Sequence, residues 1–228
     1  MSGRFLTAND LFYKWHTQDI FDRQKDKVLW TIENLEINEP GIILLAGRNG
    51  VGKSTLLRCL LGLMKPTRGN ILWFGESTLP RGRIGYLPEL PVLPARAKVS
   101  EIITSLLGLS VSDFKRKEQE LPAIRSLNIS ALMDRQAQLL SKGQQQKLLL
   151  TLALAGAPSG FVLDEPFSGL DPWARSELAD HLVQLGAQDH FLLVSSHDAP
   201  PRIRKHIRET WIIENQKLQR IPGCAIPE

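Results

Sequence analysis

Gly47-Arg48-Asn49-Gly50-Val51-Gly52-Lys53-Ser54-Thr55 is the stretch that decides the fold of this chain. A short apolar run, 42–46, precedes it, and an apolar run with helical spacing, 56–61, follows it. A glycine-rich turn between a buried strand and a helix N-terminus presents backbone N–H groups to phosphates, while Lys53 neutralises β/γ charge and Ser54 ligates Mg²⁺. The alternative, an ordinary glycine turn, lacks that context. The stretch predicts a nucleoside triphosphate site.

Composition is that of a soluble globular protein. The 228 residues are 43% hydrophobic and 23% charged, which is enough apolar content for a substantial core. No apolar segment reaches the roughly 18 to 20 residues of a membrane-spanning helix, and residues 1–10 contain no signal-peptide core. We therefore expect a cytosolic chain. Cys59 is expected to be a buried small hydrophobe and Cys224 an incidental thiol, with neither a disulfide nor a metal site.

The basic excess is modest, at +4 from 28 Lys and Arg against 24 Asp and Glu. Its densest part is the group Arg202, Arg204, Lys205 and Arg208. Such a group is more typical of a solvated helix face than of a nucleic-acid patch. Nucleic acid is therefore not an expected partner.

Apolar patterning divides the chain into three parts. Up to about Gly75 it is mixed α/β; a Pro-rich entry then leads to a helical insertion with Ser100 as its expected N-cap; afterwards strands and helices alternate. Apolar strands followed by helices imply a parallel sheet, which binds ligands at the carboxyl ends of its strands. The expected strands are 11–15, 30–37, 42–46, 71–74, 161–163 and 191–195, and the expected helices follow Lys53 and cover 144–155 and 172–185.

Two acids end the apolar run 161–163. Phosphoryl transfer beside a phosphate loop needs one carboxylate for Mg²⁺ and another to orient the attacking water. Asp164 is the candidate for the metal and Glu165 the candidate base. Taken alone, an Asp-Glu strand end is more often a solvated terminus, but pairing with the Lys53 loop favours the functional interpretation.

A further glycine-bearing turn, Leu140-Ser141-Lys142-Gly143-Gln144, starts the helix that follows. Its N–H groups and positive helix end form a second potential anion site. From these residues alone, a plain Ser-capped helix start is the favoured interpretation.

The order and spacing of these motifs resemble the nucleotide-binding subunit of an ABC transporter across nearly the whole chain. Gly47 to Ser54 resembles Walker A, and Leu140 to Gln144 resembles the LSGGQ signature with Lys142 in place of its first glycine. Phe161 to Asp164 resembles Walker B, and Glu165 stands at the position of the catalytic glutamate. ATP and Mg²⁺ are the ligands that the resemblance implies.

The resemblance also assigns the shorter motifs. Ser168 to Asp171 resembles the D-loop, and His197 resembles the switch histidine that contacts the γ-phosphate. An aromatic residue that stacks on adenine is expected upstream of Walker A; Phe21 has the best spacing, and Trp15 and Tyr13 are alternatives. The remaining histidines match no motif and are expected at the surface: His16, His181, His190 and His206.

The family implies an α/β fold with a RecA-like P-loop core and a parallel sheet, an antiparallel β subdomain and a helical subdomain. On this basis the chain is one domain, in which 1–89 and 145–228 form the core with the β subdomain and 90–144 the helical subdomain. In the family, two subunits close head to tail, so that Ser141, Lys142, Gly143 and Gln144 of one cover the ATP held by Lys53 of the other.

The implied partners are a second ATPase subunit, either an identical copy or a paralogue, and a polytopic membrane permease. The implied location is the cytoplasmic face of the inner membrane. An ATPase of this family without a transport role, acting on ribosomes, DNA or a cofactor-assembly scaffold, is the alternative. A nucleotide-binding regulator that hydrolyses poorly is a third hypothesis, prompted by Glu89 and Lys142.

One departure from the family falls next to the nucleotide. Many members have glutamine in the Q-loop, where this chain has Glu89, which cannot donate an amide hydrogen bond. Glu89 is therefore assigned to the metal with Ser54 and Asp164, and the alternative is that it caps the next segment. The Leu-Pro-Glu turn, the Leu-Ser-Lys-Gly signature and Ser-Ser-His together resemble the exporter branch, which favours export over import.

Overall fold

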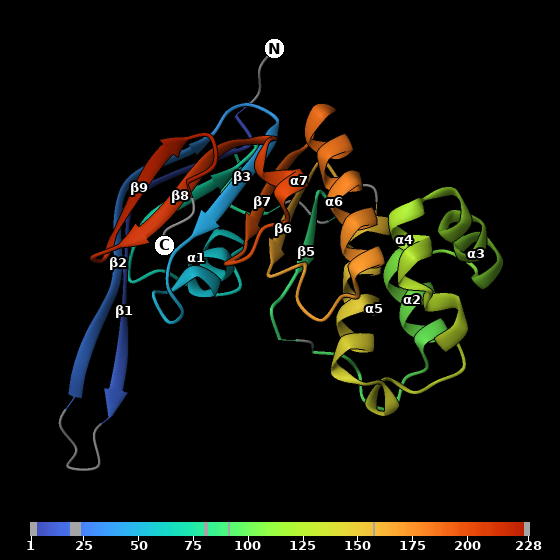
Figure 1. The fold of residues 1–228 in the computed structure, drawn as a ribbon. Helices are drawn as coiled ribbons and strands as arrows, with labels where there is room; N and C mark the ends of the chain where they lie inside the picture. The colour runs from blue at the N-terminus through green and yellow to red at the C-terminus, as the bar shows by residue number, and fades with distance from the viewer. Residues whose placement is uncertain (1–3, 19–23, 80–81, 91, 157, 226–228) are drawn as a thin grey trace.

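The computed structural model describes residues 4–18, 24–79, 82–90, 92–156 and 158–225. A nine-stranded sheet runs through the molecule in the order β4-β1-β2-β9-β8-β3-β7-β6-β5 (Figure 1). The strands are β1 (Leu6–Gln18), β2 (Gln24–Ile37), β3 (Gly41–Ala46), β4 (Arg68–Trp73), β5 (Ile84–Leu87), β6 (Gly160–Asp164), β7 (Phe191–Ser195), β8 (Ile207–Glu214) and β9 (Lys217–Pro222). The helices are α1 (Lys53–Leu60), α2 (Val99–Leu107), α3 (Val111–Glu120), α4 (Pro122–Leu127), α5 (Lys142–Ala155), α6 (Pro172–Ala187) and α7 (Pro201–Arg204).

Strands β8, β3, β7, β6 and β5 are parallel and form the centre of the sheet. Every residue of β6 and β7 is buried, because helices cover both faces. Alternate residues of β3 belong to two different cores: Ile42 and Leu44 pack toward α5 and α6, and Ile43 and Leu45 pack toward α1. The carboxyl ends of β3, β5, β6 and β7 therefore meet at one edge.

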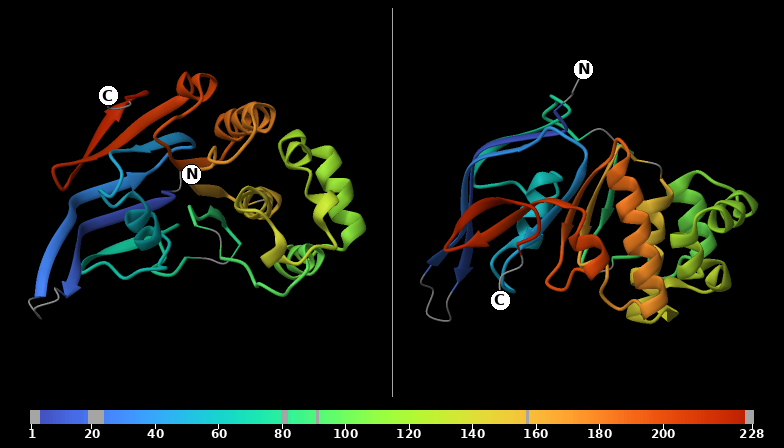
Figure 2. Two further views of the ribbon diagram at one scale, coloured as in Figure 1. Left: turned by 60° about the horizontal axis from the view of Figure 1, so that its bottom comes forward. Right: turned by 45° about the horizontal axis from the view of Figure 1, so that its top comes forward.

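The remaining strands curl over α1, as the views in Figure 2 show. β1 pairs antiparallel with both β2 and β4, and β8 pairs antiparallel with β9. A single parallel pair, Thr31 with Lys217, joins the two groups. Beyond Phe12 the β1–β2 hairpin loses its pairing with β4 and extends as a two-stranded ribbon (Figure 1).

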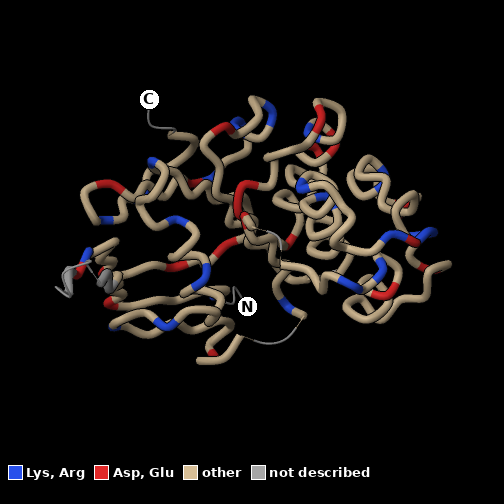
Figure 3. Tube along the Cα trace, turned by 90° about the horizontal axis from the view of Figure 1, so that it is seen from below, with Lys and Arg blue, Asp and Glu red and all other residues tan. Residues whose placement is uncertain are grey.

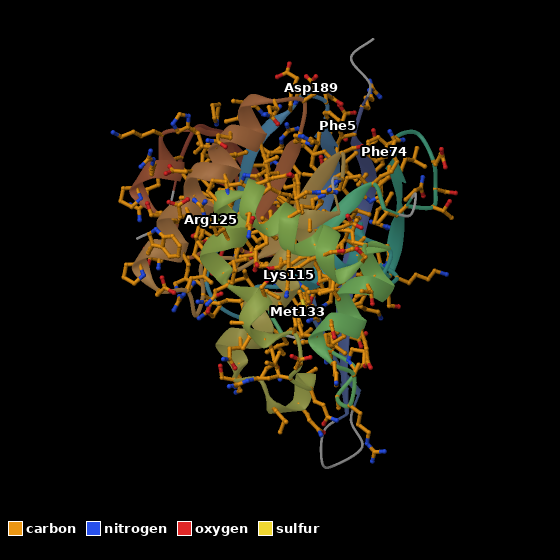
Figure 4. The ribbon with its side chains drawn as sticks, turned by 90° about the vertical axis from the view of Figure 1, so that its right-hand side faces the viewer. Phe5, Phe74, Lys115, Arg125, Met133 and Asp189 are labelled. Carbon is orange, nitrogen blue, oxygen red and sulfur yellow. The ribbon has the colours of Figure 1, made fainter. Side chains whose placement is uncertain are left out.

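Helices α2 to α4 pack beside α5 and form a separate helical layer. Figure 4 labels Lys115 of α3, Arg125 of α4 and Met133, which follows a 3-10 turn at Ile129–Leu132. Phe5 and Phe74 lie together at the other end of the same view, with ring centroids 6.1 Å apart. α5 runs through residue 144, the expected limit of the helical subdomain. The helical layer and the central sheet thus share one continuous helix.

The expected α/β fold with a parallel core, antiparallel part and helical insertion is confirmed. The prediction of Ser100 as a helix cap is wrong: α2 begins at Val99, and the Glu101 carboxylate accepts a hydrogen bond of 2.9 Å from the Lys98 backbone N–H. Lys98 is therefore the N-cap. Among the described residues, none of the helices combines the length and apolar character that a membrane crossing requires.

Two surface expectations also need correction. Arg208 does not belong to a helix face; it lies in β8, and its guanidinium donates to the Glu39 carbonyl at 2.8 Å. His181 and His190 are half-buried rather than exposed, and burial lowers the pKa of His181. Cys59 is buried as expected, and burial raises its pKa to about 12, so the thiol stays protonated.

Tight packing between β6 and β7 yields a stability prediction. A Cβ added at Gly160 would lie within 2.4 Å of three ring carbons of Phe191. Gly160→Ala should lower the free energy of unfolding by about 1–3 kcal/mol, as overpacking does in a filled core. Gly156→Ala is the matched control, because its Cβ would meet only the Leu152 carbonyl at 3.8 Å. Urea unfolding that gives the same midpoint for both variants would contradict this packing argument.

Candidate nucleotide site

The phosphate loop connects β3 to α1 through glycines in left-handed conformations. Gly52 is the N-cap of α1 with φ 101°, a value that favours glycine. A Cβ there would stand 3.0 Å from the Trp30 ring, whose Nε1–H donates to the Gly52 carbonyl at 3.3 Å. Trp30 of β2 thus supports the loop from behind, a contact that the sequence interpretation did not include.

Lys53 folds back over this loop. Its side chain is buried, and Nζ donates to the carbonyls of Gly47 at 2.8 Å and Arg48 at 3.4 Å. These neutral acceptors hold the ammonium over the loop without neutralising its charge. The arrangement keeps a positive charge beside the N–H groups at the start of α1, where an anion is favoured.

A cleft of about 260 Å³ opens beside the loop at the carboxyl edge of the sheet. Six predicted loop residues line it, together with the three predicted acids, which lie after β5 and at the end of β6, and one residue that was not predicted, Leu29. Figure 3, seen from below, shows acidic positions of separate segments around the middle of the molecule. The lining residues are Leu29, Asn49, Gly50, Gly52, Lys53, Ser54, Thr55, Glu89, Asp164 and Glu165.

Asp164 is almost fully buried, with 1% of its surface exposed. Its Oδ1 accepts a hydrogen bond from the Ser195 hydroxyl of β7. Burial raises the pKa of this carboxyl, the nearby Ser195 and Ser54 hydroxyls lower it, and the Glu89 charge raises it further. Ser195 is a positioning residue that the sequence interpretation missed, since a serine at the end of an apolar strand carries no motif.

The residues around Asp164 fit Mg²⁺. Asp164 Oδ2 is buried and has no hydrogen-bond partner within the described residues, which a bound cation would explain. The Ser54 hydroxyl donates to Glu89 Oε2 at 3.2 Å, so three oxygen donors face the same cleft. The described residues contain no group of three or more His, Cys, Asp or Glu that could hold a metal. Mg²⁺ keeps waters and phosphate oxygens among its ligands, so it needs only a few oxygen donors from the protein.

Glu165 follows in a left-handed conformation with φ 50°, a costly position for a residue with a side chain. Its backbone N–H donates to both the Ser195 hydroxyl (3.0 Å) and the Ser195 carbonyl (3.1 Å), which hold this turn. The Glu165 carboxylate lines the cleft and lies 3.0 Å from Nδ1 of His197. His197 itself is mostly exposed and does not line the cleft.

The glycine turn at 140–144 lies apart from the cleft. Ser141 accepts a hydrogen bond from the Gln144 N–H at 3.2 Å, and the Gln144 side chain accepts one from the Ser141 N–H at 3.0 Å. This capping box begins α5 at Lys142. A Cβ at Gly143 would lie 3.5 Å from the Gly169 carbonyl, so the turn packs beside the 168–171 loop. None of these residues lines the cleft of their own chain.

Asp171 caps α6 by accepting from the Ala174 N–H at 2.9 Å, and its carboxylate pairs with Lys147 of α5 at 3.0 Å. The Ala174 hydrogen bond and Lys147 together lower the pKa of Asp171. Sequence reasoning placed Asp171 but missed Lys147, because the two residues meet only through the packing of α5 against α6. The pair ties the 168–171 loop to the helix that carries Ser141.

The three aromatic candidates differ in position. Phe21 lies outside the described residues. Tyr13 is buried, with its ring 5.6 Å from Trp30, whereas Trp15 is 47% exposed and its ring is 6.4 Å from Tyr13. The three described rings form a row that starts at Trp30 beside Gly52 and ends at Trp15 on the projecting ribbon.

Residues 32–168 match the model of a protein family described as ABC transporter. The chain belongs to the ABC transporter family. Its curated relatives in this family include the uncharacterised ATP-binding protein YhaQ of Bacillus subtilis, 35% identical over 72% of this chain and 56% of that protein.

Two further relatives have named roles. The lipopolysaccharide export system ATP-binding protein LptB of Haemophilus influenzae is 33% identical over 72% of each chain. The zinc import ATP-binding protein ZnuC of Yersinia enterocolitica is 37% identical over 72% of this chain and 62% of that one. This ABC chain therefore spans less than two thirds of YhaQ and of ZnuC.

Among solved structures, the dimeric post-hydrolysis state of the ATP-binding cassette MJ0796 bound to ADP and Pi has the same fold. The TM-score is 0.74 over 97% of this chain and 100% of that one. The identity is 18%, so the likeness concerns the fold alone.

The buried Asp164 of this ABC protein predicts a pH effect. Its folded-state pKa is raised, so ionisation costs the folded state free energy once pH exceeds the unfolded-state pKa. Asp164→Asn, which has no charge to bury, should raise the melting temperature of the nucleotide-free and metal-free protein at about pH 8. The gain should shrink as pH falls to about 3, below the ordinary pKa of Asp, where the wild-type carboxyl is protonated in both states. Melting curves whose difference does not change with pH would refute this.

Proposed function

We propose that this chain is the ATP-binding and ATP-hydrolysing subunit of an ABC transporter and energises a separate membrane permease. One observation carries the proposal. A single cleft brings together Lys53 at the start of α1 and Asp164 and Glu165 at the end of β6, in a member of the ABC transporter family. Phosphate binding, metal binding and water activation thus have candidate groups within one site.

Each side chain has a task that its surroundings support. Lys53 and the N–H groups of the loop would bind the β- and γ-phosphates. Ser54, Asp164 and Glu89 would hold Mg²⁺, which when bound would neutralise the developing charge. Glu165 orients and deprotonates the attacking water. His197, 3.0 Å from the Glu165 carboxylate, fixes that carboxylate. Its contact with the γ-phosphate is what the resemblance to the family implies, because His197 does not line the cleft of its own chain.

The active form requires two subunits. The signature turn, Ser141 to Gln144, offers its own helix N-terminus to an anion but does not line the cleft of its own chain. A second subunit placed head to tail would bring this turn over the γ-phosphate, with Asp171 at the junction. ATP then joins the subunits, and hydrolysis releases them, which drives motion in the permease.

Trp15 stacks on adenine in this proposal. It is the exposed end of the aromatic row that starts beside Gly52, whereas Tyr13 is already buried in that row. A flat apolar base gains most from a ring that still has an open face. This moves the adenine contact from Phe21, which had the best spacing, to one of its two alternatives.

The permease sets the direction of transport, and we propose export across the cytoplasmic membrane, with this subunit on the cytoplasmic face. The Leu-Pro-Glu, Leu-Ser-Lys-Gly and Ser-Ser-His segments support this choice. The relatives include an export system protein, LptB, and an import protein, ZnuC, so identity alone does not decide direction.

Replacing Glu165 tests the chemistry. Glu165→Gln removes the base but keeps the side-chain shape, so steady-state ATP hydrolysis should fall on the order of 10²-fold or more. ATP binding should persist, and a stable ATP-bound dimer should accumulate because the ligand is no longer consumed. Hydrolysis by phosphate release and assembly by size-exclusion chromatography measure both effects. Unchanged turnover would remove Glu165 from the catalytic role.

Replacing Trp15 tests base recognition. Trp15→Ala should weaken binding of a fluorescent ATP analogue about tenfold, within the roughly 1–3 kcal/mol that base–aromatic stacking contributes. Trp15→Phe keeps an aromatic face and is the matched control, for which we expect a small change. If both variants bind as the wild type does, adenine is held elsewhere.

Pull-down from detergent-solubilised native membranes, followed by mass spectrometry, tests the transport role. We expect a polytopic membrane protein among the partners, and its type would establish export or import. Recovery of ribosomal, DNA-bound or scaffold proteins instead would assign the ATP site to a non-transport ABC ATPase.

A further inference from the structure

We propose that Ser54, Glu89 and Asp164 form a divalent-cation site that is occupied before ATP binds, so that the metal resides in the protein rather than arriving with the nucleotide. The inference rests on the proposed ATPase function and concerns the order in which its ligands bind. Glu89, which stands where many family members have glutamine, is the residue that would allow this early binding.

The three donors are all hard oxygens. The Ser54 hydroxyl donates to Glu89 Oε2 at 3.2 Å, which brings the start of α1 and the segment after β5 to the same point. Asp164 reaches the same cleft from the end of β6. Two carboxylates and a hydroxyl, completed by water, are a donor set that Mg²⁺ and Mn²⁺ accept.

Asp164 supplies the second, independent observation. Its side chain is 99% buried, Oδ1 accepts from the Ser195 hydroxyl, and Oδ2 has no hydrogen-bond partner within the described residues. A buried, unpaired carboxylate oxygen is costly, at about 1–3 kcal/mol or more for a charged group. A cation at Oδ2 would satisfy it in the absence of any nucleotide.

The charges that line the cleft also favour cation binding in the absence of nucleotide. Glu89, Asp164 and Glu165 line one cleft, and the nearest cation there, Lys53, directs Nζ to the carbonyls of Gly47 and Arg48. Within the described residues, neither Glu89 nor Asp164 has a salt bridge to Lys or Arg. The cleft therefore carries a negative excess that a divalent ion would neutralise.

Glutamate at position 89 determines whether the cation can bind before ATP. A glutamine would offer one neutral carbonyl oxygen, whereas the glutamate offers two oxygens and a negative charge. Cation affinity rises with the number of charged ligands, so two carboxylates hold the ion where a single one would need the phosphates of ATP. The same charge would repel the γ-phosphate of metal-free ATP, which makes prior metal binding useful.

The test uses nucleotide-free protein and Mn²⁺ alone, with free Mn²⁺ measured by electron paramagnetic resonance. We expect one saturable Mn²⁺ per wild-type chain and at least a tenfold weaker affinity in Glu89→Gln. Glu214→Gln, an exposed glutamate at the end of β8, is the matched control and should bind as the wild type does. Mn²⁺ should also raise the melting temperature of the wild type and of Glu214→Gln more than that of Glu89→Gln.

Equal Mn²⁺ affinity in Glu89→Gln and wild type, or no Mn²⁺ bound by the wild type until ADP is added, would overturn the proposal. Ser54→Ala is a second variant, which should also weaken Mn²⁺ binding, in case Glu89→Gln does not fold. Binding of a fluorescent ATP analogue with excess Mg²⁺ is measured in parallel. Its loss in the wild type would refute the nucleotide site itself, while its retention with failed Mn²⁺ binding would refute only the order of binding.

Discussion

The hydrogen bond from the Ser195 hydroxyl to the buried Asp164 carboxylate is the contact on which the site depends. It joins the carboxyl ends of β6 and β7, and the same hydroxyl accepts the Glu165 N–H at 3.0 Å. One serine thus positions both acids, the second of them in a left-handed backbone conformation. At the other end of the same two strands, Gly160 packs closely against the Phe191 ring. The geometry of the site therefore depends on the packing of the core between β6 and β7.

The second constraint concerns two helix starts, those of α1 and α5, of which only the first lines the cleft. Lys53 and Gly52 begin α1 at the cleft, while Ser141 begins α5 beside the 168–171 loop. Ser141 and its neighbours do not line the cleft that contains Lys53 of the same chain. In the proposed head-to-tail dimer, ATP bound to one subunit would be covered by the signature turn of the other, and the nucleotide would be part of the interface.

Much of the fold could be predicted from the sequence because Gly47 to Thr55 and the apolar runs around it report local structure directly. Strands β5, β8 and β9 were not predicted. β5 has only four residues, β8 has charged Arg208 and Glu209 between its apolar residues, and β9 has no buried residue. Contacts between segments that are distant in the sequence could not be predicted either. Ser195, Lys147 and Trp30 carry no motif, and their roles follow only from which strands and helices become neighbours.

In the proposed dimer, the signature turn of one subunit completes the cleft of the other. Disulfide cross-linking between Asn49→Cys and Ser141→Cys variants, each made with Cys59 and Cys224 replaced by serine, tests it most directly. We predict that a mixture of the two single variants forms an intermolecular disulfide when Mg²⁺ and ATP are added and much less without them. Cross-linking that does not depend on ATP, or an intramolecular disulfide in the double variant, would rule out a cleft completed by the second subunit.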